Sequence, residues 1–425
     1  MNNMKKKFTA FEIGSFISTT IYDDLSLSPN TRKIDKQIGN LISSIIKNKE
    51  FTGKSNESML LRTPQTNVLL IGLGNKKCIS NDKLRDAAAK ASITAKNLKT
   101  KSFSFNHDVS DMTNDYIEAV VQGSELGLYN FNVYKSNKKD FRPLTMNIII
   151  KNKTKTSLTK SIRNGEIIAD AIMLSRDISN LPSRDCTPLQ LASRAKKISS
   201  NRPLKTTVFN TVKLKKLGFG GLLGVASGSQ QPPCFIIMEY NGGKRGEKPI
   251  VFVGKTITFD TGGISIKPSA SMDEMKHDKS GGATVMAIMQ AVADLKLPVN
   301  VVGLMPATEN MPSGSAYKPG DVITFYNKKT AEILNTDAEG RVILADALSY
   351  AQNYKPRMII DFATLTGACI VALGTAVSGL LGNDKKIQHT VEKDLQFVNL
   401  LGKEVISKDV SIHWTSDIDQ EVEHV

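Results

Sequence analysis

Along much of the chain, short and mostly apolar runs with the length of a β-strand alternate with segments whose composition or apolar spacing is helical. The apolar runs lie at residues 68–71, 147–150, 206–209, 234–239, 250–253, 299–304 and 358–361. Helical spacing or alanine-rich composition marks residues 82–98, 161–177, 188–198, 283–295 and 342–352. Strands that alternate with helices in this way predict an α/β fold, with mostly parallel or mixed sheets covered by helices.

The pattern also predicts two domains. Residues 1–160 are expected to form a small α/β domain, and residues 161–200 a linker helix and connection. Residues 201–425 are expected to form a larger domain that carries the candidate chemistry. Within the connection, Thr187 is expected to cap a helix that begins at Pro188, because proline is tolerated in a first helical turn.

Positive charge is concentrated in the N-terminal part of the chain. Residues 1–160 carry 26 Lys and Arg against 14 Asp and Glu, whereas residues 161–425 carry 30 against 27, for a formal net charge of +15. Such an excess could bind DNA or another acidic surface. A lysine-rich, solvated face is the simpler interpretation.

Several features predict a cytoplasmic protein. The four cysteines lie far apart with no C-x-x-C pair, which favours neither a disulfide framework nor a structural zinc site. The basic N-terminus is followed by Glu12 and Gly14 and not by a long apolar core, so a signal peptide is not expected. Residues 362–382 are uncharged, but their glycines and threonines favour a buried strand, turn and short helix over a membrane span.

Two segments of the second domain hold the candidate chemistry. Their charged residues of interest are Lys255, Asp260, Lys267, Asp278, Asp337, Glu339 and Arg341. Several converging carboxylates are what a pair of hard divalent cations needs. A lysine close to such ions could be neutral and ligate, while one set further off would stay charged and polarise a carbonyl.

Taken singly, these signals are weak, since an isolated D-x-E is usually a solvated turn. Their occurrence together at strand ends of one domain is what favours a site. The histidines are isolated, with no H-E-x-x-H, which argues against an imidazole-rich zinc centre.

Three motifs extend the argument to a family. They are VGKTITFDTGGISIKP at 253–268, MDEMKHD at 272–278 and NTDAEGR at 335–341. These segments closely resemble the leucyl aminopeptidase family of cytosol aminopeptidases, over roughly residues 165–385. Residues 1–160 resemble it only in general layout.

The resemblance implies a metal-dependent aminopeptidase that hydrolyses N-terminal residues from peptides and assembles as a homo-hexamer. It implies two divalent ions, Mn²⁺ or Zn²⁺, held by Lys255, Asp260, Asp278, Asp337 and Glu339. It also implies that Lys267 stabilises the oxyanion, that Arg341 holds a bicarbonate which transfers a proton, and that the cleft is lined by Thr364, Leu365 and Gly367.

The sequence departs from the family in two places. Lys279 stands where the family usually has methionine, in the wall of the first specificity pocket. Its cation would either weaken selection for leucine-like side chains or reach outward and change little. Beyond residue 384 the chain is shorter than the family pattern, which predicts a truncated end with exposed sheet edges and apolar faces.

Two alternatives to a working aminopeptidase stay open on the sequence. One is a DNA-binding or architectural protein that acts through the basic N-terminal domain. The other is an inactive, truncated remnant.

Overall fold

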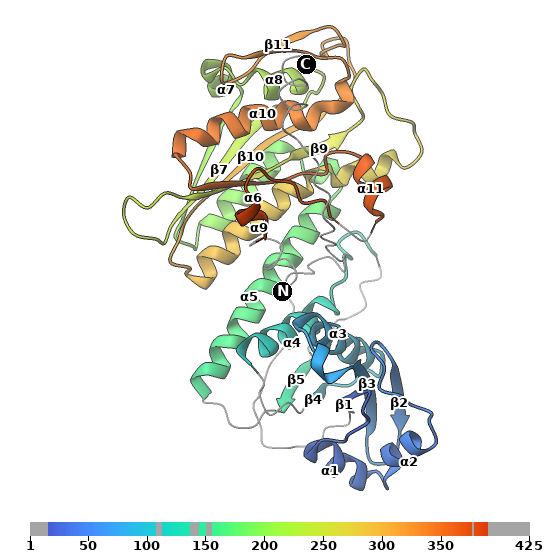
Figure 1. Ribbon diagram of the computed structural model, residues 1–425. Coiled ribbons are helices and arrows are strands. Elements are labelled where there is room, and N and C mark those ends of the chain that lie inside the picture. Colours follow the sequence, from blue (N-terminus) through green and yellow to red (C-terminus); the bar gives the residue numbers. More distant parts are fainter. Residues whose placement is uncertain (1–15, 108–112, 137–143, 150–154, 376–377, 390–425) are drawn as a thin grey trace. The chain divides into compact units, whose positions relative to one another are not determined.

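The computed structural model describes residues 16–107, 113–136, 144–149, 155–375 and 378–389 (Figure 1). Its contacts divide the chain near residue 170 into two units, and helix α5 (Lys155–Asn180) runs across this division. Each unit contains a sheet with helices on both faces, so the predicted α/β fold is confirmed. The domain limits at residues 160 and 200 stay a prediction. Ile150 of one predicted strand and the tail from residue 390 onward lie outside the described residues.

The sheet of the first unit is mainly parallel. Its strands follow the order β2 (Ser58–Arg62), β3 (Asn67–Gly74), β1 (Phe16–Tyr22), β4 (Ser102–Asn106) and β5 (Thr145–Ile149). Of the pairings among the described strands, only that of β2 with β3 is antiparallel. On one face lie α1 (Pro29–Gln37) and α2 (Leu41–Lys47), and on the other α3 (Asn81–Asn97) and α4 (Asn114–Leu126).

The two-residue period of the strands explains this arrangement. Val68 and Leu70 of β3 belong to the core under α1 and α2, while Leu69 and Ile71 belong to the core under α3 and α4. Successive side chains of a strand point to opposite faces, so a fully apolar strand supports helices on both.

The sheet of the second unit is mixed. Its strands follow the order β13 (Met358–Phe362), β8 (Ile250–Gly254), β10 (Asn300–Asn310), β7 (Cys234–Asn241) and β6 (Leu204–Phe209), and β9 (Thr256–Asp260) also pairs with β10. The pairings of β8 with β13 and of β10 with β8 and β9 are parallel, whereas β7 is antiparallel to both β10 and β6.

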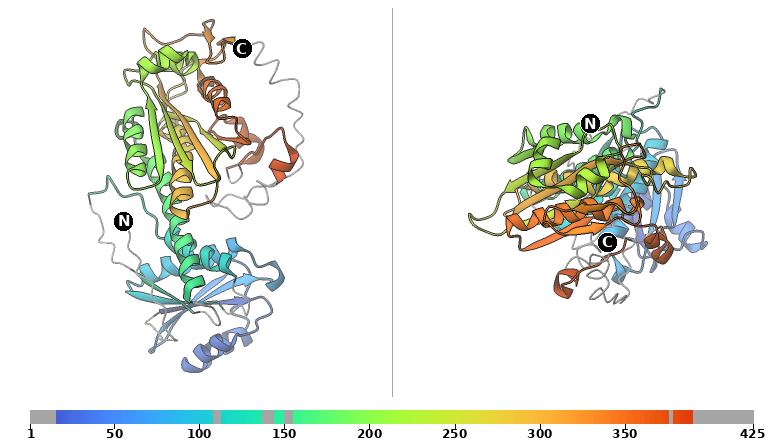
Figure 2. Two further views of the ribbon diagram at one scale, coloured as in Figure 1. Left: turned by 90° about the vertical axis from the view of Figure 1, so that its left-hand side faces the viewer. Right: turned by 90° about the horizontal axis from the view of Figure 1, so that it is seen from above.

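Helices cover both faces of this second sheet. One face contacts α6 (Pro188–Ser199) and α9 (Ser280–Leu295), and the other mainly contacts α8 (Gly220–Ala226) and α10 (Glu339–Ala351). The left view of Figure 2 shows the green α6 and the orange α10 on opposite sides of the strands. In β10, a Cβ on Gly303 would lie 2.8 Å from Cγ1 of Val285, so glycine lets α9 pack closely on the sheet.

The predicted start of α6 is confirmed. The Thr187 side chain accepts a hydrogen bond from the Gln190 N–H, and the Gln190 side chain accepts one from the Thr187 N–H. This reciprocal pair is a capping box, with Pro188 in the first turn. The remaining elements of the unit are α7 (Thr211–Leu217), β11 (Val322–Thr324), β12 (Thr330–Glu332) and α11 (Ala368–Leu373).

The stretch 362–382 contains the predicted short helix but is not buried as expected. Strand β13 forms one edge of the described sheet, and α11 has no buried residue, with Val371 89% exposed. Lack of charge leads to burial only where another element covers the segment. Phe362 pairs with β8 and Thr364 contacts Asp278, but among the described residues no element buries a side chain of α11. Among those residues, too, no helix has the length and apolar character needed to cross a bilayer.

A buried carboxylate connects two helices of the second unit. Asp346 of α10 is fully buried and accepts hydrogen bonds from the backbone N–H of Leu222, at 2.9 Å, and of Tyr326, at 2.8 Å. The Asp346 carboxylate thereby provides an acceptor for one backbone N–H group in the first turn of α8 and for another in the loop after β11.

We predict that Asp346→Ala lowers the free energy of unfolding by roughly 2–4 kcal/mol, because the buried N–H of Leu222 and the partly buried N–H of Tyr326 lose their acceptor. The matched control is Asp384→Ala, since Asp384 also accepts two backbone N–H groups, from Lys386 and Ile387, but is exposed to water. Urea denaturation of both variants measures the difference. Equal midpoints for the two variants would contradict the structural role of Asp346.

Candidate metal centre

Strand ends and helix starts of the second unit bring the predicted ligands together. Lys255 follows β8, Asp260 ends β9 and Glu339 begins α10. Asp278 lies in the short helix η3 (Met272–Lys279), and Asp337 lies in the short helix η4 (Thr336–Ala338). Charged groups at the ends of neighbouring parallel strands are expected to meet at one edge of the sheet.

The distances show that the five side chains form one cluster. Carboxylate oxygens of Asp260, Asp337 and Glu339 all lie within 4.8 Å of one another. The Lys255 Nζ lies 2.8 Å from Oδ1 of Asp278 and 2.8 Å from Oε1 of Glu339. A cation bound by two carboxylates is thus already part of the arrangement.

A second ammonium group lies at the partly exposed side of the cluster. Lys267 Nζ is 2.9 Å from Oδ2 of Asp260 and also forms an ion pair with Asp337. Its side chain is 21% exposed, compared with 3% for that of Lys255. Four carboxylates and two ammonium groups leave the cluster with a formal charge of −2.

Two glycines form the turn that brings Lys267 to the acids. Gly262 and Gly263 have φ values of 86° and 67°, in the left-handed region that side chains disfavour. A Cβ on Gly262 would also lie 2.9 Å from Oδ1 of Asp337. The turn closes where the Lys267 N–H donates to the Thr261 carbonyl at 2.9 Å.

Neutral side chains that sequence reasoning did not single out hold the two acidic segments together. Asn310 donates from Nδ2 to Oδ1 of Asp260 at 2.9 Å and to the Thr336 carbonyl at 3.0 Å. The Thr336 hydroxyl donates to the Gly262 carbonyl, and the Tyr317 hydroxyl donates to the Thr336 carbonyl. A signal in the sequence is that Asn310 lies a few residues after the apolar run 299–304, where a buried amide needs hydrogen-bond partners.

Burial in a crowded, negatively charged space shifts the pKa values of two acids of the cluster. It raises the pKa of Glu339 to about 8 and that of Asp278 to about 6, although the Lys255 ammonium opposes both shifts. Burial lowers the pKa of Lys255, but Asp278 and Glu339 outweigh it, so that pKa lies above its ordinary value. The same holds for Lys267, whose hydrogen bonds with Asp337 and Asp260 raise its pKa. All four pKa values are raised, which indicates that the site favours additional positive charge.

Unpaired oxygens provide a direct test of whether a metal fits. Oδ2 of Asp278 and Oε2 of Glu339 are buried and have no hydrogen-bond partner among the described residues. A buried carboxylate oxygen without a donor is costly unless a cation binds it. The donor set, hard oxygens with one amine, therefore fits divalent metal ions.

The remaining predicted site residues lie at different distances from this cluster. Thr364 contacts it directly, since its hydroxyl donates to Oδ1 of Asp278 at 2.6 Å and its carbonyl accepts from Lys255 Nζ at 2.9 Å. Leu365 and Gly367 follow Thr364 and are exposed, and Arg341 is exposed in the first turn of α10. Lys279 is fully buried, with its ammonium directed toward the end of α5.

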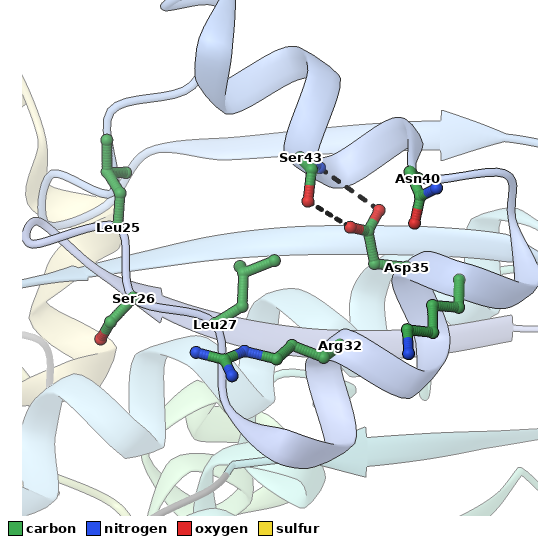
Figure 3. A pocket seen from close by; sticks show the side chains of 8 residues that line it. Leu25, Ser26, Leu27, Arg32, Asp35, Asn40 and Ser43 are labelled. Atoms are coloured by element: carbon green, nitrogen blue, oxygen red, sulfur yellow. Dashed lines mark hydrogen bonds between the residues drawn. The ribbon is translucent and has the colours of Figure 1, made fainter.

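A polar hollow in the first unit is not part of this chemistry. Its volume is about 390 Å³, and its lining includes Arg32, Asp35 and Ser43. Figure 3 shows Asp35 turned toward Ser43, whose N–H and hydroxyl both donate to its carboxylate. Oδ1 of Asp35 also accepts from the Ile42 N–H at 2.7 Å, so this acid caps α2.

Comparison with known proteins identifies the family. Residues 173–399 match the model of the cytosol aminopeptidase family, catalytic domain, and residues 19–138 match that of its N-terminal domain. The chain belongs to the cytosol aminopeptidase family. The predicted resemblance and the peptidase class are confirmed.

Among curated relatives, a probable cytosol aminopeptidase of Cenarchaeum symbiosum is 46% identical over 330 residues, which is 77% of this chain and 67% of that protein. One of Geobacter sulfurreducens is 40% identical over 89% of this chain and 77% of its own length. Among solved structures, a tomato leucine aminopeptidase mutant is similar with a TM-score of 0.84 and 28% identity, covering 96% of this chain and 81% of that one. The bottromycin maturation enzyme BotP in complex with Mn is also similar, with a TM-score of 0.77 and 28% identity over 92% of this chain and 81% of that one.

We predict that Gly340→Ala impairs the site, because the added Cβ would lie 2.6 Å from Cε and 2.8 Å from Nζ of Lys255. Displacing this ammonium should lower kcat/KM for leucine p-nitroanilide by about 100-fold, the usual scale for a misplaced catalytic group. Gly314→Ala is the control, since a Cβ there meets no atom within 4 Å. Wild-type kinetics for Gly340→Ala would show that Lys255 does not need its present position.

Proposed function

We propose that the chain is a metal-dependent aminopeptidase that uses two divalent ions to release N-terminal residues, leucine-like ones among them, from peptides. The residues proposed to hold the ions are Lys255, Asp260, Asp278, Asp337 and Glu339. The observation that carries the proposal is the pair of buried, unpartnered oxygens on Asp278 and Glu339, in a cluster with excess negative charge. Family membership gives the reaction class.

When bound, divalent ions supply a Lewis acid for the scissile carbonyl and lower the pKa of water. Hard carboxylate oxygens suit Mn²⁺, and Zn²⁺ is the other candidate. The similar BotP structure is a complex with Mn, which supports testing this ion first.

The chain's own side chains would supply the remaining functions. The partly exposed Lys267 ammonium can donate a hydrogen bond to negative charge that develops on the scissile oxygen, which is worth roughly 3–4 kcal/mol of the barrier. Arg341, exposed in the first turn of α10, could hold a bicarbonate, which would supply a proton acceptor beside the metal site. Thr364 contacts Asp278, and with Leu365 and Gly367 it is proposed to line the substrate cleft.

Hexamer formation and a cytoplasmic location belong to the same proposal. No observation on the described residues favours the DNA-binding alternative.

We expect Asp337→Ala to abolish both metal binding and hydrolysis, because it removes a carboxylate from the group of three oxygens within 4.8 Å. Metal content by elemental analysis and turnover of leucine p-nitroanilide measure the two effects. Asp384→Ala, which removes an exposed carboxylate elsewhere, should behave as wild type.

Lys267→Ala should separate binding from catalysis. Removing this cation frees Asp260 and Asp337 for metal, so metal content should stay near that of the wild type, while kcat falls by about 100- to 1,000-fold. Metal analysis and steady-state kinetics on the same preparation test this. Parallel loss of metal and turnover would make Lys267 part of the metal site and not an oxyanion donor.

A further inference from the structure

We propose that Lys279 is a positioning residue for Asp278, and that it sets the metal affinity of the site without taking part in the specificity pocket. The inference rests on the proposed function, because it takes Asp278 as a metal ligand. Lys279 directly follows Asp278 at the junction of η3 and α9.

The Lys279 ammonium has no donor left for a substrate. Its side chain is fully buried, and Nζ donates to the carbonyls of Leu181, at 2.8 Å, Ser179, at 3.3 Å, and Lys276. An ammonium group has three protons, and three carbonyls take them. An acidic substrate side chain would have to break these bonds to gain one of its own.

The end of α5 explains why a cation is stable there. Helix α5 ends at Asn180, so the Ser179 carbonyl is among the last four, which lack partners within the helix. These carbonyls carry partial negative charge, which a cation stabilises.

The other contacts of the junction explain why Lys279 matters for Asp278. Gly282 N–H donates to the Lys255 carbonyl at 2.8 Å, and a Cβ on Gly281 would lie 2.0 Å from the carbonyl oxygen of Phe362. Gly281 and Gly282 therefore hold the junction of η3 and α9 against β8 and β13. Lys279 holds the same junction against the end of α5. Loss of the second attachment would let Asp278 move relative to Lys255.

Lys279→Met tests the inference, since methionine has a similar unbranched shape but no donor. Lys296→Met is the matched control, because Lys296 is exposed at the other end of α9. Titration calorimetry of the metal-free, full-length chain with Mn²⁺ gives the affinity. Kinetics at saturating Mn²⁺ with leucine and glutamate p-nitroanilides give the substrate preference.

We expect Lys279→Met to weaken Mn²⁺ binding by about 10-fold or more, as is usual when a group that orients a ligand is lost. The ratio of kcat/KM for the two substrates should stay within about twofold of wild type, because Lys279 does not face the substrate. Lys296→Met should match wild type in both. Unchanged Mn²⁺ affinity in Lys279→Met, with or without a changed substrate ratio, would overturn the inference.

If circular dichroism shows that Lys279→Met does not fold, Lys279→Gln replaces it, because the amide keeps two N–H donors. An intermediate loss of Mn²⁺ affinity in that variant supports the inference, and wild-type affinity overturns it. A wild-type chain that neither binds Mn²⁺ nor hydrolyses leucine p-nitroanilide overturns the proposed function and this inference together, before any variant is compared.

Discussion

The second unit depends on an unequal balance of charge in a small, largely buried space. Two ammonium groups lie among four carboxylates, at distances such as the 2.8 Å from Lys255 Nζ to Asp278 and to Glu339. Removing ions from water is costly unless they are paired, and these lysines pair only part of the negative charge. The cluster is therefore arranged for cations that the chain itself does not supply.

Backbone structure, and not the charges alone, keeps this arrangement together. Like charges in one space repel each other, so the acids stay close only because rigid elements present them. Strand β9 presents Asp260, the Asn310 amide joins it to the Thr336 carbonyl, and Gly340 leaves room for Lys255. Where a glycine approaches a carbonyl or an ammonium this closely, the identity of the residue follows from the packing.

The sequence was sufficient for the elements with strong periodicity. The motifs shared with the family also singled out the charged side chains that lie together in the cluster, and their role as metal ligands stays a prediction. Helix α6 with its Thr187 cap and the strand at 250–253 follow from local pattern, which tertiary packing reinforces. The composition of the 362–382 stretch could not by itself decide its burial, because an apolar run is compatible with both a covered and an uncovered edge. Asn310 and the direction of Lys279 were equally hidden, since hydrogen bonds over long sequence separations leave no local pattern.

Anomalous X-ray diffraction at the manganese edge, from crystals of the 425-residue chain grown with Mn²⁺, shows directly whether this cluster binds two metal ions. We expect two peaks within the group formed by Lys255 and the four carboxylates, with oxygens of Asp278 and Glu339 among the ligands. The absence of anomalous density there, at a Mn²⁺ concentration that supports hydrolysis, would contradict this expectation.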